Sequence, residues 1–301
     1  MRKRLLYSLL TPLLLTVACE DAGLQPVAEE EKETRLRIQV RNADTEDDIQ
    51  LLVFDARAPK AIESYYPAVS GDAGIDIGTG NRIVACVLNG PDLSSVADFS
   101  SLLLWRYVPG ESDNPFTRPL RFGYIQTAIS PNTHTLSLDA TLQAGRIVLR
   151  SVANRLNGRQ TIESLHAYLA NAAADNLLGS DYLPDAVSIH PAGNAASISE
   201  WTDVSLTTIP YGSTHTGPFL FSSCPTPPSW QPWLILCARI SGRDWYYNIP
   251  LETITKGISQ EVSVVLRTLG ADSPCIANQP GSYDLFYALA DWAVVPSSEL
   301  I

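Results

Sequence analysis

The stretch Arg35-Leu36-Arg37-Ile38-Gln39-Val40-Arg41, followed after a polar loop by Ile49-Gln50-Leu51-Leu52-Val53-Phe54, decides the fold. In the first segment apolar residues alternate with polar ones, which is typical of a strand with one face on a core and the other in water. The second segment is apolar on both faces, which predicts a central strand of a sheet. The loop between them, Asn42 to Asp48, is a short connection.

Further strand patterns, separated by turn residues, occupy the rest of the chain. They are Arg82 to Leu88, Thr133 to Leu138, Arg146 to Val152, Ile162 to Leu169, Trp233 to Ile240, Trp245 to Leu251, Glu261 to Leu266 and Asp284 to Val295. Ser241 to Asp244 is predicted to be a hairpin loop. Asp92 to Trp105 is the best candidate for a helix, with Asp92 able to cap it. Many short strands with frequent turns predict an all-β protein built from β-sandwiches.

The N-terminal end has the pattern of an export signal. A basic segment, Met1 to Arg4, precedes the apolar run Leu5 to Leu15 and the small residues before Cys19. This run is shorter than the roughly 20 residues of a transmembrane helix, so residues 1–18 are expected to be a cleaved signal peptide. A cysteine directly after the cleavage point resembles the lipobox of bacterial lipoproteins, in which this residue is acylated. Thr16 stands where Leu, Val or Ile is usual, and a plain secretory signal cut nearby is the alternative.

Residues 19–34 form a second N-terminal segment, which has almost nothing to bury. It includes Glu29-Glu30-Glu31-Lys32-Glu33 and is predicted to be an acidic, solvated tether. The formal net charge of the whole sequence is −11. This charge argues against nucleic acid as a partner, because binding to nucleic acid depends on clusters of Lys and Arg.

The sequence contains no motif of a known catalytic or cofactor site. We therefore expect no catalytic residue, no cofactor and no metal ion, and interpret the protein as one that is not an enzyme. The carboxylates of Asp44 to Asp48 could bind calcium in principle, but they lack the glycine and the spacing of a known calcium loop, which favours an acidic hairpin tip. The histidines are isolated from one another and from other metal ligands: His134, His166, His190 and His215.

Cysteines and tryptophans leave two alternatives open. Apart from Cys19, the cysteines fit no zinc pattern, and Cys86 lies in an apolar run where a buried side chain is expected. Cys224 and Cys237 could form a disulfide, but pairing does not follow from spacing. Trp230 and Trp233 could contribute to a glycan-binding platform, although packing in the core is the commoner use of tryptophan in strands.

Several segments, taken in order, resemble motifs of the Bacteroidetes fimbrillins, in particular the shorter anchor-type lipoproteins. Asp48 to Asp55 is similar to the family's "I-x-L-x-V-F-D" strand, and Arg82 to Asn89 to its "Y-x-V-x-A-x-x-N". Val148 to Ala153 resembles the "V-x-R-x-V-A-K" strand, with Asn154 in place of the basic residue. Val264 to Pro274 is similar to "L-x-G-x-G-S-D-x-P", and Ala290-Asp291-Trp292 to the terminal tryptophan strand. The acidic segment after Cys19 also resembles the surface-export signal of Bacteroidetes lipoproteins.

The resemblance implies two transthyretin-like β-sandwich domains after the lipoprotein signal peptide, residues 35–142 and 143–301, and a place in surface fimbriae. It implies other fimbrial subunits as partners, which are bound by donation or acceptance of a β-strand. It also implies the outer membrane as a partner, through lipid such as palmitate on Cys19, and a location at the cell surface.

In the fimbrillins that polymerise, an arginine-specific protease cuts after the first strand, and the corresponding residue here is Arg41. Arg35, Arg37 and Arg41 can equally be ordinary solvent-facing residues. A protease needs an extended, locally mobile stretch, so the short loop after Arg41 favours a first strand that is retained. We therefore expect a minor subunit that anchors or terminates a fimbria and supports cell adhesion. The alternatives are a polymerising stalk or tip subunit cut at Arg41, and a surface lipoprotein that binds glycans.

Overall fold

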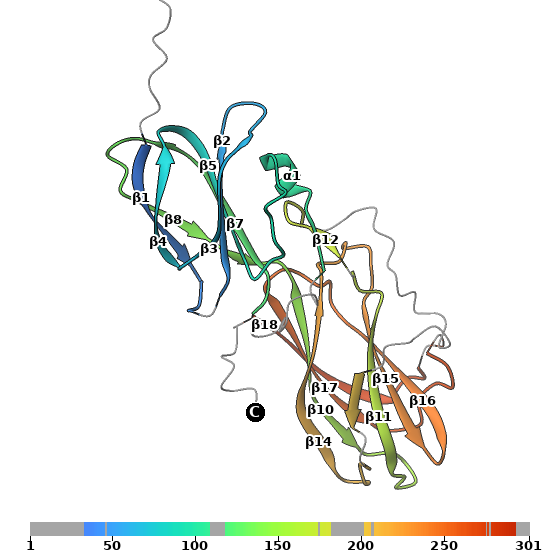
Figure 1. The fold of residues 1–301 in the computed structure, drawn as a ribbon. Helices are drawn as coiled ribbons and strands as arrows, with labels where there is room; N and C mark the ends of the chain where they lie inside the picture. Colours follow the sequence, from blue (N-terminus) through green and yellow to red (C-terminus); the bar gives the residue numbers. More distant parts are fainter. Residues whose placement is uncertain are drawn as a thin grey trace, which may run out of the picture. The chain divides into compact units, whose positions relative to one another are not determined.

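The structure is a computed structural model that describes residues 33–45, 47–108, 118–173, 175–181, 202–205, 208–274, 276 and 278–292. Strands make up nearly all of its regular structure and form two β-sandwiches (Figure 1), which confirms the predicted all-β fold class. The predicted signal peptide, Cys19 and the tether up to Lys32 lie outside the described residues. Within the described ranges, no helix is long and apolar enough to cross a membrane.

The first sandwich packs a three-stranded sheet against a five-stranded sheet. The three-stranded sheet has the order β4-β1-β8 and consists of β4 (Asp72–Gly78), β1 (Glu33–Arg41) and β8 (Thr135–Asp139). The five-stranded sheet has the order β3-β2-β5-β7-β9 and consists of β3 (Ile62–Val69), β2 (Ile49–Asp55), β5 (Gly80–Leu88), β7 (Arg121–Ile129) and β9 (Thr141–Leu142). Strand β2 has a hydrogen-bonded neighbour on each side, which confirms the prediction of a central strand.

The alternation in β1 has the predicted effect on burial. Leu36, Ile38 and Val40 lie in the core of the first sandwich, and the arginines between and beside them are exposed. The core-facing side chains meet apolar residues of β2 and β5 from the opposite sheet. Strand β1 therefore contributes one whole row of the interface between the two sheets.

The helix predicted over Asp92 to Trp105 is wrong in its extent. Only α1 (Phe99–Leu103) is helical, and its cap is Asp98, whose carboxylate accepts a hydrogen bond from the backbone N–H of Ser101 at 2.8 Å. The carboxylate of Asp92 instead accepts from the backbone N–H of Ser94 at 3.0 Å and from its hydroxyl at 2.9 Å. Such a local bond to the residue two positions ahead turns the chain and competes with helix formation.

The second sandwich packs two four-stranded sheets. One has the order β14-β10-β17-β18 and consists of β14 (Thr214–Ser223), β10 (Gly145–Asn154), β17 (Ile258–Leu266) and β18 (Tyr283–Asp291). The other has the order β13-β11-β15-β16 and consists of β13 (Thr202–Ser205), β11 (Ile162–Ala170), β15 (Trp233–Ile240) and β16 (Arg243–Pro250). The predicted hairpin loop is shorter than expected: Ser241 and Gly242 alone join β15 to β16, with φ of 52° and 74°. Positive φ at both positions is the geometry of a tight hairpin turn.

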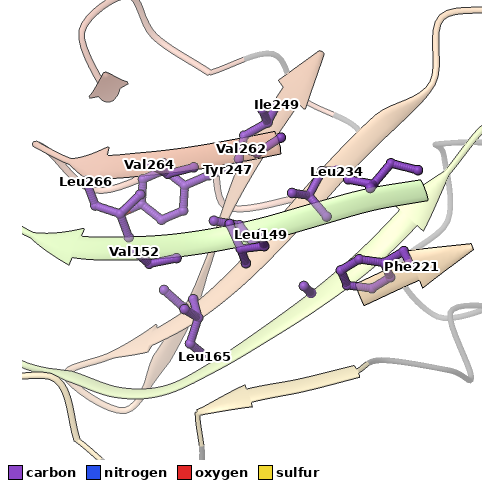
Figure 2. Close-up of a cluster of buried hydrophobic side chains, with 14 of the residues drawn as sticks. Leu149, Val152, Leu165, Phe221, Leu234, Tyr247, Ile249, Val262, Val264 and Leu266 are labelled. Carbon is purple, nitrogen blue, oxygen red and sulfur yellow. The ribbon is translucent and has the colours of Figure 1, made fainter. Parts of the chain in front are cut away.

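Apolar side chains from both sheets fill the second sandwich. Figure 2 shows Leu149 of β10 and Val262 of β17 in the same cluster as Leu165 and Leu234, which come from the opposite sheet. Tyr247 is also fully buried, and its hydroxyl donates a hydrogen bond to the backbone carbonyl of Thr268 at 2.9 Å. The hydroxyl of this buried tyrosine thus has a hydrogen-bond partner.

Contacts beyond the two sheet pairs join the segment after β5 to the second half of the chain. The short strands β6 (Arg106–Tyr107) and β12 (Asn176–Leu177) pair antiparallel. An apolar cluster contains Phe54 of β2 and Phe99 of α1 together with Leu178 and Cys224 from later in the chain. The cysteines at positions 86, 224 and 237 are buried free thiols, so the disulfide considered between the last two is not formed.

Substitution of Leu234 by alanine should lower the free energy of unfolding by about 2–5 kcal/mol, because it leaves a cavity in a closed core. Leu289→Ala is the matched control in the same sandwich, since the side chain of Leu289 is 58% exposed, and it should change stability by no more than about 0.5 kcal/mol. Urea unfolding of both variants measures the difference. An equal loss of unfolding free energy in the two variants would contradict the burial of Leu234 in the core.

The three described cysteines should not react with a thiol reagent such as Ellman's reagent at pH 8 while the protein is folded. Burial raises the pKa of the Cys86 and Cys237 thiols to about 12, and it raises the pKa of Cys224 as well. At pH 8 the reactive thiolate form of these cysteines is therefore scarce. In a Cys275→Ser variant, denaturation should release three reactive thiols in addition to any that react in the folded state. A release of only one would indicate a disulfide between Cys224 and Cys237.

Candidate functional site

The site residues that the sequence suggested lie at or before the first strand. Cys19 lies outside the described residues, and Arg41 is the last residue of β1. The guanidinium of Arg41 is 3.6 Å from the carboxylate of Asp139 at the end of β8, and both side chains are more than half exposed. Because such exposed ion pairs contribute little to stability, the contact orients Arg41 more than it holds the strand.

The position of β1 between two strands is the main geometric feature of this site. Residues Glu33 to Gln39 pair antiparallel with β4, and residues Arg37 to Arg41 pair parallel with β8. No hydrogen bond of the sheet joins β4 directly to β8. Loss of β1 would therefore leave a groove with an unpaired backbone edge on each side, which is a template for another strand.

The buried side chains of β1 hold the strand in this groove. Leu36 and Ile38 are fully buried and Val40 is 8% exposed. Burial of a side chain of this size stabilises the folded state by about 1.5–3 kcal/mol. Together with the backbone hydrogen bonds to both neighbours, this burial makes spontaneous release of the intact strand unfavourable.

The acidic segment Asp44 to Asp48 is not the tip of a hairpin, so that prediction is wrong. The strands that it joins, β1 and β2, belong to different sheets, so the segment crosses from one sheet to the other. The side chain of Asp47 is only 2% exposed and forms an ion pair with Arg121 at 2.8 Å. In the described part of the chain, no group of three or more His, Cys, Asp or Glu side chains could hold a metal ion.

Sequence reasoning missed the partners of this loop. Arg121 begins β7 and is 74 positions from Asp47, and Asn89, which follows β5, is 42 positions away. No spacing rule connects residues at such separations. A lone arginine at the start of an apolar strand is at best a weak signal that a buried carboxylate lies nearby.

A second structural feature is the free edge of the second sandwich at β18. In the described residues β17 is the only strand that pairs with β18 in the sheet, and Phe286 and Leu289 of β18 are 61% and 58% exposed. Trp292, just beyond the strand, is buried, and its backbone N–H donates to the carbonyl of Gly257 at 2.7 Å. The guanidinium of Arg146 lies over its ring, 5.3 Å from the centroid. The strand is therefore open along its edge and fixed at its end.

The edge of the opposite sheet at β16 is covered. Ala271 and Tyr246 exchange two backbone hydrogen bonds of 2.8 Å each. The amide side chain of Asn278 donates to the carbonyl of Tyr246 at 2.7 Å. These residues occupy the outward backbone groups of Tyr246 as a further strand would, so the middle of the edge of β16 is protected against pairing with another chain.

The tryptophans considered for a glycan platform each pack against an apolar cluster. Trp230 packs against the cluster that contains Phe99 and Cys224, and Trp233 packs against the separate cluster that contains Tyr168 and Ile235. Both side chains are partly buried. Both tryptophans therefore contribute to packing, which is the commoner role of tryptophan side chains.

No protein-family model and no curated protein matches this sequence. Several solved structures match its fold. A "putative cell adhesion protein" from Bacteroides eggerthii DSM 20697 has a TM-score of 0.63 and 17% identity, with 87% of this chain and 97% of that chain covered. A protein described in the same words from Parabacteroides distasonis ATCC 8503 has a TM-score of 0.59 and 13% identity, with 89% and 98% covered.

A fimbrilin from Porphyromonas gingivalis W83 also matches, with a TM-score of 0.61 and 10% identity over 88% of this chain and 99% of that chain. At sequence identities this low, the structural matches establish the fold alone. The chain therefore has the fimbrillin-like two-sandwich fold that the order of its motifs predicted.

Proposed function

We propose that this protein is a minor fimbrial subunit that anchors or terminates a fimbria and supports cell adhesion. It is bound to the outer membrane at the cell surface by an acyl chain, such as palmitate, on Cys19. The likeness of its fold to that of the Porphyromonas gingivalis fimbrilin supports a structural role and not an enzymatic one. In this proposal residues 1–18 are the signal peptide and residues 19–34 the tether, and the two sandwiches span residues 35–142 and 143–301.

The placement of β1 is the observation that carries the anchoring role. The tether leads directly into β1, which is hydrogen-bonded on both sides and buries Leu36, Ile38 and Val40. A pull on the lipid would load the whole length of the strand against β4 and β8. An anchor needs the segment that carries its lipid to be part of the fold, and this arrangement meets that need.

Other fimbrial subunits are the proposed partners, and the open edge of β18 supports pairing with one of them. An extended segment of a neighbour can hydrogen-bond to a free strand edge and place alternate side chains against the sheet. The exposed Phe286 and Leu289 offer apolar contacts at that edge.

The alternative is a stalk or tip subunit that polymerises after cutting at Arg41. The exposure of the Arg41 side chain favours this alternative. The groove that would open between β4 and β8 could accept the strand of a neighbour. The two proposals differ in the fate of β1, which is retained in an anchor and lost from a polymerising subunit.

Lipidation predicts that labelled palmitate appears on the protein in growing cells and is absent from a Cys19→Ala variant. Loss of the only acylated side chain should move the protein from the membrane fraction to the soluble fraction, because a buried acyl chain contributes about 0.8 kcal/mol per methylene. Cys275→Ser is the matched control and should keep both the label and the membrane location. An unlabelled protein in the membrane fraction would contradict the proposed anchor.

Retention of β1 predicts slow cutting after Arg41 when the purified mature protein is incubated with the arginine-specific protease clostripain. The strand is paired on both sides, and a protease requires an extended and locally open substrate. Mass spectrometry of the fragment that begins at Asn42 measures the rate, and Arg41→Gln identifies background signal. Rapid release of this fragment, followed by ladders of oligomers, would favour the polymerising subunit.

A further inference from the structure

A buried ion pair fixes the loop between β1 and β2. Arg121 and Asp47 are 5% and 2% exposed at their side chains, and the guanidinium Nη1 lies 2.8 Å from the carboxylate Oδ2. Exposed pairs such as Arg37 with Asp72 also contact β1, but water competes for those groups. The pair at Arg121 is shielded from water and therefore holds its geometry more firmly.

The carboxylate of Asp47 accepts two further hydrogen bonds. The amide side chain of Asn89 donates to Oδ1 at 2.6 Å, and the backbone N–H of Asp44 donates to Oδ2 at 2.8 Å. Arg121 also donates to the backbone carbonyl of Asn42. The Asp47 carboxylate is thus bonded to donors from the loop itself, from the residue after β5 and from the start of β7.

The exit of the loop is fixed as well. The backbone N–H of Asn89 donates to the carbonyl of Asp48 at 2.8 Å, and the N–H of Asp48 donates to the side-chain oxygen of Asn89 at 3.1 Å. The guanidinium of Arg118 lies 2.8 Å from the carboxylate of Asp48. Both ends of the loop are therefore bonded to residues of the five-stranded sheet or its connections.

The backbone next to Arg41 has the wrong shape for a protease substrate. Arg41 itself is still in register with Asp139 of β8. The next residue, Asn42, has a φ of 63°, so the chain turns immediately after Arg41. A protease would need this turn to open into an extended stretch, and opening requires the carbonyl of Asn42 to leave Arg121.

We propose that Arg121, Asp47 and Asn89 form a clasp that keeps the loop closed and the peptide bond after Arg41 protected from proteolysis, so that β1 and the tether stay with the protein. This inference rests on the proposed anchoring role, since only a subunit that keeps its lipid has to keep β1. The inference identifies the residues that keep β1 attached to the rest of the protein.

The test measures clostripain cutting after Arg41 in the purified mature protein and in variants of the clasp. Asp47→Asn keeps the shape of the side chain and removes its charge, and Arg121→Met removes the guanidinium. Both should be cut about tenfold faster or more, because they raise the population of the open loop. Asn89→Ala should show a smaller increase in the same direction.

Val53→Ala is the matched control, since it weakens the core of the same sandwich and removes none of the polar contacts of the clasp. Variants are compared at urea concentrations that give equal fractions of unfolded protein. Under these conditions Val53→Ala should be cut at Arg41 within about twofold of the unaltered protein, because matched global unfolding leaves only local opening to differ. Amide hydrogen exchange of residues 42–48 should rise in the clasp variants and not in the control.

Equal cutting rates in the unaltered protein and in Asp47→Asn, or equal acceleration by Val53→Ala, would overturn the clasp. If Arg121→Met does not fold, Asp47→Asn and Asn89→Ala decide the question. Rapid cutting of the unaltered protein would overturn the clasp and the anchoring role together. Slow cutting of every variant would overturn the clasp alone, and a missing palmitate label would overturn the lipid anchor alone.

Discussion

The pairing of β1 with β4 on one side and β8 on the other is the constraint on which the first sandwich depends. The partner residues on β8, Thr135 to Asp139, are about a hundred positions away along the chain, and the pairing is parallel. Without β1 the sheet would separate into two single strands, and Leu36, Ile38 and Val40 would leave a gap in the core. The first strand of the described residues is therefore also the strand that closes the sandwich.

The described sheet edges differ in how they are protected against pairing with other chains. Strand β16 is covered by a loop, β3 contains Pro67 and two register shifts, and β14 contains Pro218 and a shift opposite β10. Proline and bulges at an edge discourage the addition of another strand. Strand β18 has no proline, and its register with β17 is continuous over all nine residues. An edge that is long, regular and apolar at Phe286 is suited to an interaction with another chain.

Local patterns in the sequence predicted the strands in which runs or alternation of apolar residues are clear, such as β1, β2 and β5, because burial of one or both faces imposes that period. They missed β3, β4, β7 and β14, in which most side chains are only partly buried or exposed or the apolar period is weak. The same reasoning was wrong about the helix. Leu93, Val96, Phe99 and Leu102 recur at intervals of three, and all are buried. Their spacing reflects contact with the core, whereas the hydrogen bonds of Asp92 turn the chain before the short helix begins. The candidate site was predicted only as far as Arg41, since the partners of Asp47 come from distant strands.

The loop between β1 and β2 also illustrates why a buried ion pair can be more useful than an apolar contact. Removing two charges from water costs free energy that their attraction only partly returns, so apolar side chains of similar volume would often stabilise the fold equally well. Apolar contacts, however, do not fix the relative orientation of the groups that they bring together. The guanidinium of Arg121 reaches both the carbonyl of Asn42 and the carboxylate of Asp47 from one rigid plane. In the proposed clasp, this directional hold keeps the turn after Arg41 closed, because the backbone cannot extend until both bonds of Arg121 are broken.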